Sequence, residues 1–291
     1  HQASLRVLSE MGINFLLEDA KEILKDAGAD VDPNSDRVRF DPAFIEEKIR
    51  AVPSEFSLHS RNPDNRITMG GNNINLAIVG SPPNVSDIEK GRRRGNFKDF
   101  QDLIRLAQMI NVCGLIGGYP VEPIDIHPNL RHLEALSSMA RLCDKPLFLY
   151  SLGRQRVKDS IEIAKLAAGY DEETFQRQPL VHTIVNANSP LQYDKPMLAG
   201  VIELASRLQP VVFTPFTLAG AMAPVTMAGA LVQQNAEALA GIAFTQIVNP
   251  GSPVIYGGFT SNVDMDDVED SESESDSESD RWLPEKSGTA P

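Results

Sequence analysis

Short apolar segments recur along the middle of the chain at nearly constant spacing. They are apolar at almost every position rather than at alternate ones, which is typical of strands buried on both faces of a parallel sheet. Between them lie stretches with apolar residues at helical spacing, such as Phe97, Phe100, Ile104 and Ala107. The six predicted strands are Leu76–Val79, Val112–Ile116, Pro146–Tyr150, Leu180–Val185, Pro210–Phe213 and Pro253–Tyr256.

The spacing of these segments predicts the fold class. Successive starts lie 36, 34, 34, 30 and 43 residues apart, which is the length of a strand–helix unit. Two α/β architectures compete, an open doubly wound sheet and an eight-stranded (β/α) barrel. No G-x-G-x-x-G follows the first strand, and the even spacing favours the barrel. We therefore predict a TIM-type (β/α)8 barrel that is incomplete at its C-terminus, with about six strands present.

The chain divides into three predicted parts. Residues 1–74 form an α/β cap, with helices over Ala3–Leu8 and Glu18–Ala27, a strand at Arg37–Phe40, a helix opened by Asp41–Pro42, and a small β element at Phe56–His59. Residues 75–265 form the partial barrel. Residues 266–291 form a disordered tail, because acidic residues alternate there with serine and offer nothing to bury.

Composition and charge narrow the function classes. The net charge is −13, but nine acids lie between residues 266 and 280, and the remainder is close to −4 with no basic footprint for nucleic acid. The longest weakly polar run, Thr217–Val232, is too short for a bilayer span and contains Pro224, so no membrane contact is predicted. Two cysteines without paired spacing and no leader before the fold predict a cytoplasmic protein.

A long block of sequence carries a family resemblance. Residues 210–265 read PVVFTPFTLAGAMAPVTMAGALVQQNAEALAGIAFTQIVNPGSPVIYGGFTSNVDM. Together with Arg37–Phe40, Phe56–Arg61 and Gly70–Gly71, this block resembles the trimethylamine methyltransferase family, over roughly residues 1–265. The resemblance implies a (β/α) barrel that demethylates a tertiary or quaternary amine, such as trimethylamine or glycine betaine, and delivers the methyl group to the Co(I) of a corrinoid protein.

The same resemblance implies what this chain lacks. The cobalamin-type corrinoid belongs to a partner protein, so we expect no cofactor and no metal site in this chain. The last barrel strands, which carry the pyrrolysine of those members that have one, lie beyond its end. Lys286–Pro291 is similar to the segment with which the family continues after Asn-Val-Asp-Met, so residues 266–285 are interpreted as an insertion or an assembly error.

Candidate substrate-binding residues follow from the barrel, whose reacting groups gather at the carboxyl ends of the strands. Transfer of a methyl group from nitrogen to Co(I) requires the amine to leave neutral, so the site must hold a cation. Aromatic faces attract cations, and Tyr119, Phe216 and Phe259 are the candidates, with core packing as the alternative. No catalytic residue is singled out.

Polar residues at the same rim complete the predicted site. Glu122 and Asp264 are candidates for a counter-charge, or anchor loops instead. Asn186 and Asn188 are candidates for binding the carboxylate of a betaine, although turn formation explains them nearly as well. His182 lies centrally in its strand, which favours a barrel-interior role over that of a base.

Other features leave alternatives open. The run from Gly91 to Gly95 is predicted as a solvated loop, with contact to an anionic corrinoid partner or a phosphate as the alternative. A lyase or aldolase is disfavoured because no lysine ends a strand: Lys145 precedes one and Lys195 opens a helix. A truncated, catalytically inert barrel remains the main rival, and its open edges favour aggregation or a homo-oligomer.

Overall fold

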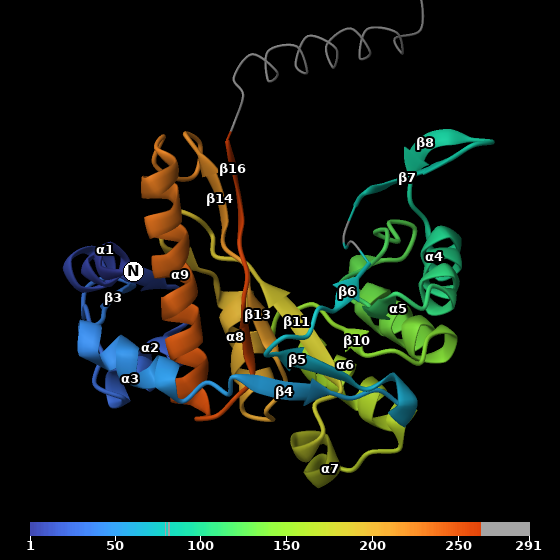
Figure 1. The fold of residues 1–291 in the computed structure, drawn as a ribbon, viewed down its shortest axis with the longest axis horizontal. Helices are drawn as coiled ribbons and strands as arrows, with labels where there is room; N and C mark the ends of the chain where they lie inside the picture. The colour runs from blue at the N-terminus through green and yellow to red at the C-terminus, as the bar shows by residue number, and fades with distance from the viewer. Residues whose placement is uncertain (79, 81, 263–291) are drawn as a thin grey trace, which may run out of the picture.

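The computed structural model describes residues 1–78, 80 and 82–262 (Figure 1). Each of the six predicted strands is present within its predicted range, and each pairs in parallel with a neighbour. Val79, the last residue of the first predicted strand, lies outside the described residues. The strands are β6 (Leu76–Ala77), β9 (Cys113–Leu115), β10 (Leu147–Phe148), β11 (Val181–Val185), β13 (Val211–Phe213) and β15 (Val254–Tyr256).

The strands lie side by side in the order in which they occur along the chain. β6 pairs with β9, and β10, β11, β13 and β15 form a second group in sequence order. The backbone N–H of Ile116 donates to the carbonyl of Pro146 at 3.2 Å, which joins the two groups. A doubly wound sheet would reverse its strand order midway, and this one does not. The predicted α/β class with parallel strands is confirmed, and the described strands do not close into a cylinder.

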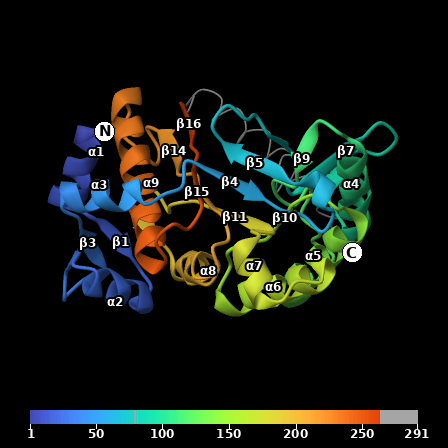
Figure 2. The same ribbon diagram turned by 60° about the horizontal axis from the view of Figure 1, so that its bottom comes forward.

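Helices between the strands cover the outer face of the sheet. Figure 2 shows α8, α6 and α5 following one another along that face. Side-chain caps start these helices: Asn96 and Asp99 form a capping box at α4, and Asp194 accepts from the N–H of Met197 at α8. The helices are α4 (Phe97–Met109), α5 (Pro128–Leu142), α6 (Arg154–Ala168), α7 (Glu172–Arg177), α8 (Lys195–Ala205) and α9 (Met227–Val248).

Strand register separates an outer row of side chains from an inner row. Thr183, Val211 and Val254 are register partners and are buried. The next row, with Ile184 on β11 paired with Val212 on β13, faces the other way, because side chains alternate along a strand. Ile184 is 36% exposed, so the inner face of the sheet is partly open.

The N-terminal part is joined to the sheet through α9 and one short strand. α1 and α3 pack against α9, and β1 pairs in parallel with β12, which follows β11 in the chain. The predicted helices and the strand near residue 38 are confirmed, whereas β1, β2 and β12 were not predicted. The elements are α1 (Gln2–Arg6), a π-helix (Val7–Met11), β1 (Ile13–Phe15), α2 (Glu18–Asp26), β2 (Asp30–Val31), β3 (Arg37–Arg39), α3 (Pro42–Arg50) and β12 (Gln192–Tyr193).

A hairpin covers the end at which the strands enter the sheet. It contains the small β element that was predicted at Phe56–His59. Strands β4 (Glu55–Leu58) and β5 (Ile67–Gly70) are antiparallel and are joined through a 3-10 turn (Pro63–Asn65). The N–H of His59 donates to the carbonyl of Pro179, two residues before β11, at 2.6 Å.

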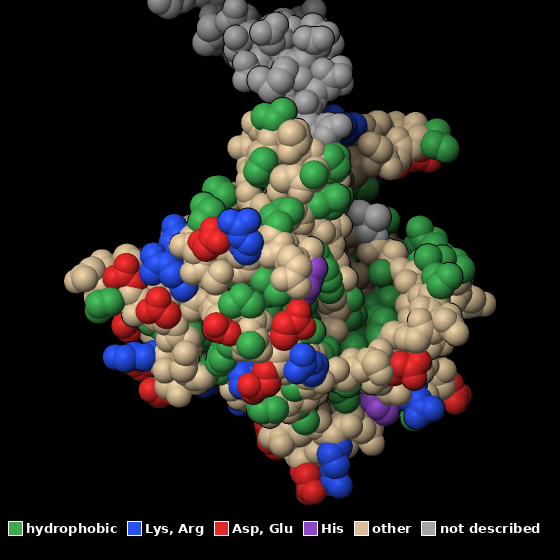
Figure 3. All heavy atoms as spheres, turned by 60° about the vertical axis from the view of Figure 1, so that its left-hand side comes forward, with side chains coloured by type: hydrophobic (Ala, Val, Ile, Leu, Met, Phe, Trp, Pro, Cys, Tyr) green, Lys and Arg blue, Asp and Glu red, His purple; other side chains and the backbone are tan. Residues whose placement is uncertain are grey.

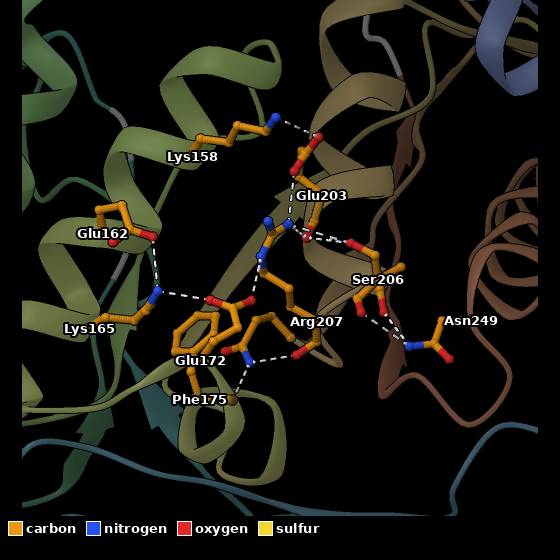
Figure 4. A network of polar contacts seen from close by, with 11 residues as sticks. Lys158, Glu162, Lys165, Glu172, Phe175, Glu203, Ser206, Arg207 and Asn249 are labelled. Carbon is orange, nitrogen blue, oxygen red and sulfur yellow. Dashed lines mark hydrogen bonds and ion pairs between the residues drawn. The ribbon is translucent and has the colours of Figure 1, made fainter.

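A polar network fixes helices α6, α7 and α8 to one another (Figure 4). Glu172 accepts from Lys165 Nζ at 2.8 Å and from Arg207 Nε at 3.0 Å. Arg207 also donates to Glu203 Oε2 at 2.8 Å. Such partly exposed ion pairs contribute little stability singly, and their role here is to set helix positions.

Two further strand pairs extend the molecule beyond the exit end of the sheet. β14 (Phe216–Ala219) and β16 (Phe259–Asn262) are parallel, and β7 (Asn84–Asp87) and β8 (Gly91–Arg94) form an antiparallel hairpin. Figure 1 shows both pairs rising from the same end of the molecule, on opposite sides of it. The run Gly91–Gly95 was predicted as a solvated loop. Its first four residues, Gly91–Arg94, are mostly exposed, but the loop assignment was wrong because they form a strand ladder with residues 84–87.

Among the described residues no helix combines the length and the apolar character needed to cross a membrane.

Candidate functional site

A cavity of roughly 500 Å³ lies at the carboxyl ends of β10, β11, β13 and β15. Figure 3 shows the surface hollowed beside the column formed by α9, with hydrophobic side chains on the walls of the hollow. None of the described residues that line the cavity is acidic, basic or a histidine. The lining residues are Gly80, Gly117, Phe148, Tyr150, Ser151, Leu152, Ile184, Asn186, Met197, Thr214, Phe216, Gly258 and Phe259.

Aromatic rings form a large part of this lining. Phe216 and Phe259 are register partners on β14 and β16, and their rings stack with centroids 4.8 Å apart. Phe148 and Tyr150 meet edge to face on the neighbouring wall, with centroids 5.0 Å apart. An uncharged cavity with aromatic walls attracts a cation through the negative faces of the rings and does not bind it as an ion pair.

Asn186 supplies a polar group at the end of β11. Its side-chain oxygen accepts a hydrogen bond from Thr214 Oγ1 on the adjacent strand at 2.7 Å. In the part of the chain that the structure describes, its amide nitrogen makes no hydrogen bond. The nitrogen is therefore available as a donor to an acceptor group of a ligand.

The loop that follows Asn186 is fixed to α9 by a buried carboxylate. Glu237 is fully buried and accepts from Ser189 Oγ and from the N–H of Leu191, both at 2.7 Å. Burial raises the pKa of Glu237, while the hydrogen bonds from Leu191 and Ser189 act in the opposite direction. Because three donors, including Gln233, converge on one carboxylate, the loop is held in a defined position.

Asn188 lies on this loop but does not line the cavity. Its backbone N–H donates to the carbonyl of Gln192 at 2.7 Å, which agrees with the turn-forming alternative. Asp264, another candidate, lies outside the described residues, as do residues 266–291 with the predicted acidic tail.

Tyr119 and Glu122 line a second, smaller cavity of about 80 Å³, which shares Tyr150 and Leu152 with the first. Tyr119 is 2% exposed and packs edge to face against Tyr150, with centroids 4.5 Å apart. Burial raises its pKa far above the ordinary value, so the hydroxyl stays protonated. Glu122 accepts from Arg131 at 2.9 Å, so its charge is already compensated.

The structure thus brings together three of the predicted residues, Asn186, Phe216 and Phe259, and sets Tyr119 and Glu122 one wall away. Prediction from the sequence missed Tyr150, which borders both cavities. An aromatic residue as the last position of the predicted strand Pro146–Tyr150 was a usable signal. Ser151, the next residue, also lines the larger cavity.

His182 occupies the inner face of β11, two residues before Ile184, and does not line the cavity. It is 3% exposed and lies edge-on to Phe148, with ring centroids 5.7 Å apart. Burial lowers the pKa of His182 to about 4, so the ring is neutral at pH 7. His182 is thus buried as predicted, on the inner face of a sheet that the described strands do not close into a barrel, and its Nδ1 has no hydrogen-bond partner among the described residues.

Within residues 1–78, 80 and 82–262, no three His, Cys, Asp or Glu side chains are grouped so as to hold a metal ion.

Comparison with known proteins gives a consistent result. The family model described as trimethylamine methyltransferase matches residues 1–267. The chain is 35% identical over 265 residues to a glycine betaine methyltransferase of Desulfitobacterium hafniense, which covers 91% of this chain and 55% of that protein. It is 27% identical to a proline betaine:corrinoid methyltransferase of Eubacterium limosum, over 92% of this chain and 56% of that protein. It is 26% identical to a trimethylamine methyltransferase of Methanosarcina barkeri, over 91% of this chain and 54% of that protein. The chain therefore spans about half the length of the curated relatives it matches.

Proposed function

Because this chain belongs to the trimethylamine methyltransferase family, we propose that the protein of which it is part transfers a methyl group from a quaternary amine to the Co(I) of a corrinoid carried by a separate protein. The observation that carries the proposal is the uncharged aromatic cavity at the exit end of the parallel strands. Relatives are named for methyl transfer from glycine betaine, trimethylamine and proline betaine, and one is named for transfer to a corrinoid.

The lining of the cavity favours a quaternary nitrogen over trimethylamine. A quaternary ammonium loses its methyl group to a nucleophile and leaves as a neutral tertiary amine, with no proton required. Neutral trimethylamine would release the dimethylamide anion unless an acid supplied a proton, and the described lining holds no carboxyl, ammonium or imidazolium group to supply one. Each aromatic face that contacts the cation contributes about 0.5–2 kcal/mol.

Asn186 further favours a substrate that carries a carboxylate. Its amide nitrogen is a hydrogen-bond donor at the wall of the cavity, and Thr214 holds the amide by its oxygen. A betaine combines a methylated cation with a carboxylate, and both parts find a complementary group here. In this arrangement Asn186 orients the substrate, and the methylated nitrogen lies against the free face of the stacked Phe216–Phe259 pair.

The corrinoid is placed at the mouth of the cavity and not in its interior, as part of this proposal. A space of roughly 500 Å³ holds a small amine, whereas a corrin macrocycle with its side chains is larger. Bound at the mouth, the cofactor would supply the cobalt nucleophile that accepts the methyl group. The residues of this chain bind the ammonium and orient it with a methyl group towards the mouth.

We also propose that the six strands are the first six of an eight-stranded barrel. Their parallel pairing in sequence order and the lengths of the relatives support this. The free edges of β6 and β15 would then pair with strands encoded beyond this chain. The rival proposal, an inert truncated barrel, differs in that the 291-residue chain would be the complete product.

An assay of methyl transfer tests the proposed function. The full-length protein is mixed with Co(I) cobalamin and either glycine betaine or trimethylamine, and the absorption change from Co(I) to methyl-Co(III) is followed. We expect methylation with glycine betaine that depends on the protein and is faster than with trimethylamine. If neither amine transfers a methyl group, the proposed function is refuted. If the 291-residue chain alone is fully active, two further strands are not needed.

A further inference from the structure

The β7–β8 hairpin carries a surface that the amine site does not use. Figure 1 shows the hairpin standing clear of the rest of the chain, at the end of the molecule where β14 and β16 also rise. The segment that leads into it begins at Gly80, which lines the amine cavity. Ile88, in its turn, is fully exposed. The hairpin therefore projects beside the mouth of the cavity.

One face of the hairpin anchors it to the body of the protein. Arg93 forms a salt bridge with Asp99, the residue that completes the capping box of α4, and a second one with Asp87 at 3.3 Å. The N–H of Gly95 donates to the carbonyl of Pro83 at 3.1 Å, which closes the base of the hairpin. Because the Arg93–Asp99 pair ties the hairpin to α4, its direction is set before any partner arrives.

The other face carries two arginines that have no partner within the described residues. Side chains alternate along a strand, so Arg92 and Arg94 point away from the side on which Arg93 is anchored. Both are exposed, and neither takes part in an ion pair in the described part of the chain. Two exposed guanidinium groups on one face of the hairpin, with an exposed apolar residue in its turn, form the kind of surface that protein interfaces select.

We propose that Ile88, Arg92 and Arg94 form a docking surface for an acidic patch on the corrinoid-carrying protein; this inference rests on the proposed function. The cobalt must reach the cavity mouth, so the carrier has to approach the end from which the hairpin projects. Charge complementarity next to that mouth increases the association rate and orients the carrier. The alternative is that the acidic residues 266–280 of this chain, and not the corrinoid-carrying protein, bind to this surface.

The test reverses the two charges in the full-length protein. Arg92→Glu/Arg94→Glu is compared with wild type using two methyl acceptors, free Co(I) cobalamin and the purified corrinoid protein of the same organism. We expect unchanged rates with free cobalamin, and kcat/KM for the corrinoid protein lowered by about tenfold or more. The fall of the wild-type rate with added salt should also become shallower in the variant.

A matched control separates docking from total charge. Arg50→Glu/Arg66→Glu makes the same charge change on two exposed arginines near the β4–β5 hairpin, at the opposite end of the strands, and should behave as wild type. Equal rates with the corrinoid protein for both double variants would overturn the proposal. A higher affinity of Arg92→Glu/Arg94→Glu for the corrinoid protein would also overturn the proposal. It would show that residues 266–280 occupy the two arginines in the wild type and that the corrinoid protein has to displace them.

Direct binding distinguishes this proposal from the proposed function. The affinity of the corrinoid protein for wild type and for Arg92→Glu/Arg94→Glu is measured by calorimetry without substrate. Tighter binding by the wild type supports docking even if no methyl transfer is seen, in which case only the proposed function fails. Equal affinities, or equal losses of activity with both acceptors, would contradict a docking role.

Discussion

Phe216 on β14 and Phe259 on β16 are register partners, and their rings stack with centroids 4.8 Å apart and planes 9° apart. The two rings therefore form one wall of the amine cavity. Phe259 is 58% exposed, which is unusual for a phenylalanine and gives this wall its access to solvent. Because the rings contact each other, the effects of changing them should not be additive.

Removal of either ring should weaken substrate binding. For Phe216→Leu or Phe259→Leu we expect KM for glycine betaine to rise roughly 2- to 30-fold, the effect of losing about 0.5–2 kcal/mol of cation–π attraction. Phe216→Tyr keeps the aromatic face and serves as the control. Steady-state kinetics with Co(I) cobalamin give the result. Leucine variants with unchanged KM would show that these rings only pack.

A charge placed at Asn186 should alter the choice of substrate. Asn186→Asp puts a carboxylate on the cavity wall, which repels the carboxylate of a betaine and attracts a cation that lacks one. We expect KM for glycine betaine to rise by about tenfold or more, while binding of tetramethylammonium improves. Asn188→Asp adds the same charge on the same loop outside the cavity lining. If Asn186→Asp and Asn188→Asp change KM for glycine betaine equally, Asn186 does not bind the carboxylate of the substrate.

Close packing of α8 against the end of β10 should be sensitive to one methyl group. A Cβ at Gly200 would overlap Ser151 Oγ, which donates to the carbonyl of Met197 at 2.9 Å. We expect Gly200→Ala to lower the free energy of unfolding by about 1–3 kcal/mol and to displace Ser151 at the cavity wall. Denaturant unfolding measures this, and adding Ser151→Gly should restore part of the loss. If Ser151→Gly does not restore stability to Gly200→Ala, the strain does not arise from the contact with Ser151.

The buried His182 should make stability depend on pH. Its pKa is lowered from 6.5 to about 4 in the folded chain, so below pH 6.5 the unfolded chain takes up a proton that the folded chain does not. Stability is therefore fully present above pH 6.5 and falls as the pH drops towards 4, by about 3 kcal/mol at most. Burial also lowers the pKa of the partly buried His59, which adds a smaller effect of the same sign.

The replacement His182→Leu should remove most of this dependence, as measured by the urea midpoint between pH 7 and pH 5. His127→Asn, a change at an exposed histidine that keeps an N-cap side chain on α5, is the matched control. If His182→Leu and wild type lose stability in parallel, other groups are responsible.

Much of the parallel sheet could be predicted because buried strands and amphipathic helices have distinct apolar periods. Elements that depend on distant partners could not. β1 is three residues long and exists because Asn14 and Phe15 pair with Gln192 and Tyr193, far away in the sequence. The β7–β8 hairpin was missed because a run of arginines has little strand preference. Its ladder and the salt bridges of Arg93 to Asp87 and Asp99 stabilise it instead.

Part of the site could be predicted for a similar reason. Asn186, Phe216 and Phe259 follow predicted strands, and parallel strands bring their ends together. Which way a loop residue faces is not encoded locally. Glu237 on α9 fixes the turn that follows Asn186, and this turn keeps Asn188 out of the cavity lining. Likewise, Glu122 was a plausible counter-charge until the structure placed Arg131 beside it.

The central claim is that the cavity recognises the positive charge of a methylated nitrogen through aromatic faces. Calorimetric titration of the full-length protein with glycine betaine and with the anion of tert-butylacetic acid tests it most directly, since the two ligands share shape and carboxylate and differ in that charge. We predict that glycine betaine binds at least about tenfold more tightly, in keeping with two or more cation–π contacts. Equal affinities would contradict the account, because shape and the carboxylate alone would then explain binding.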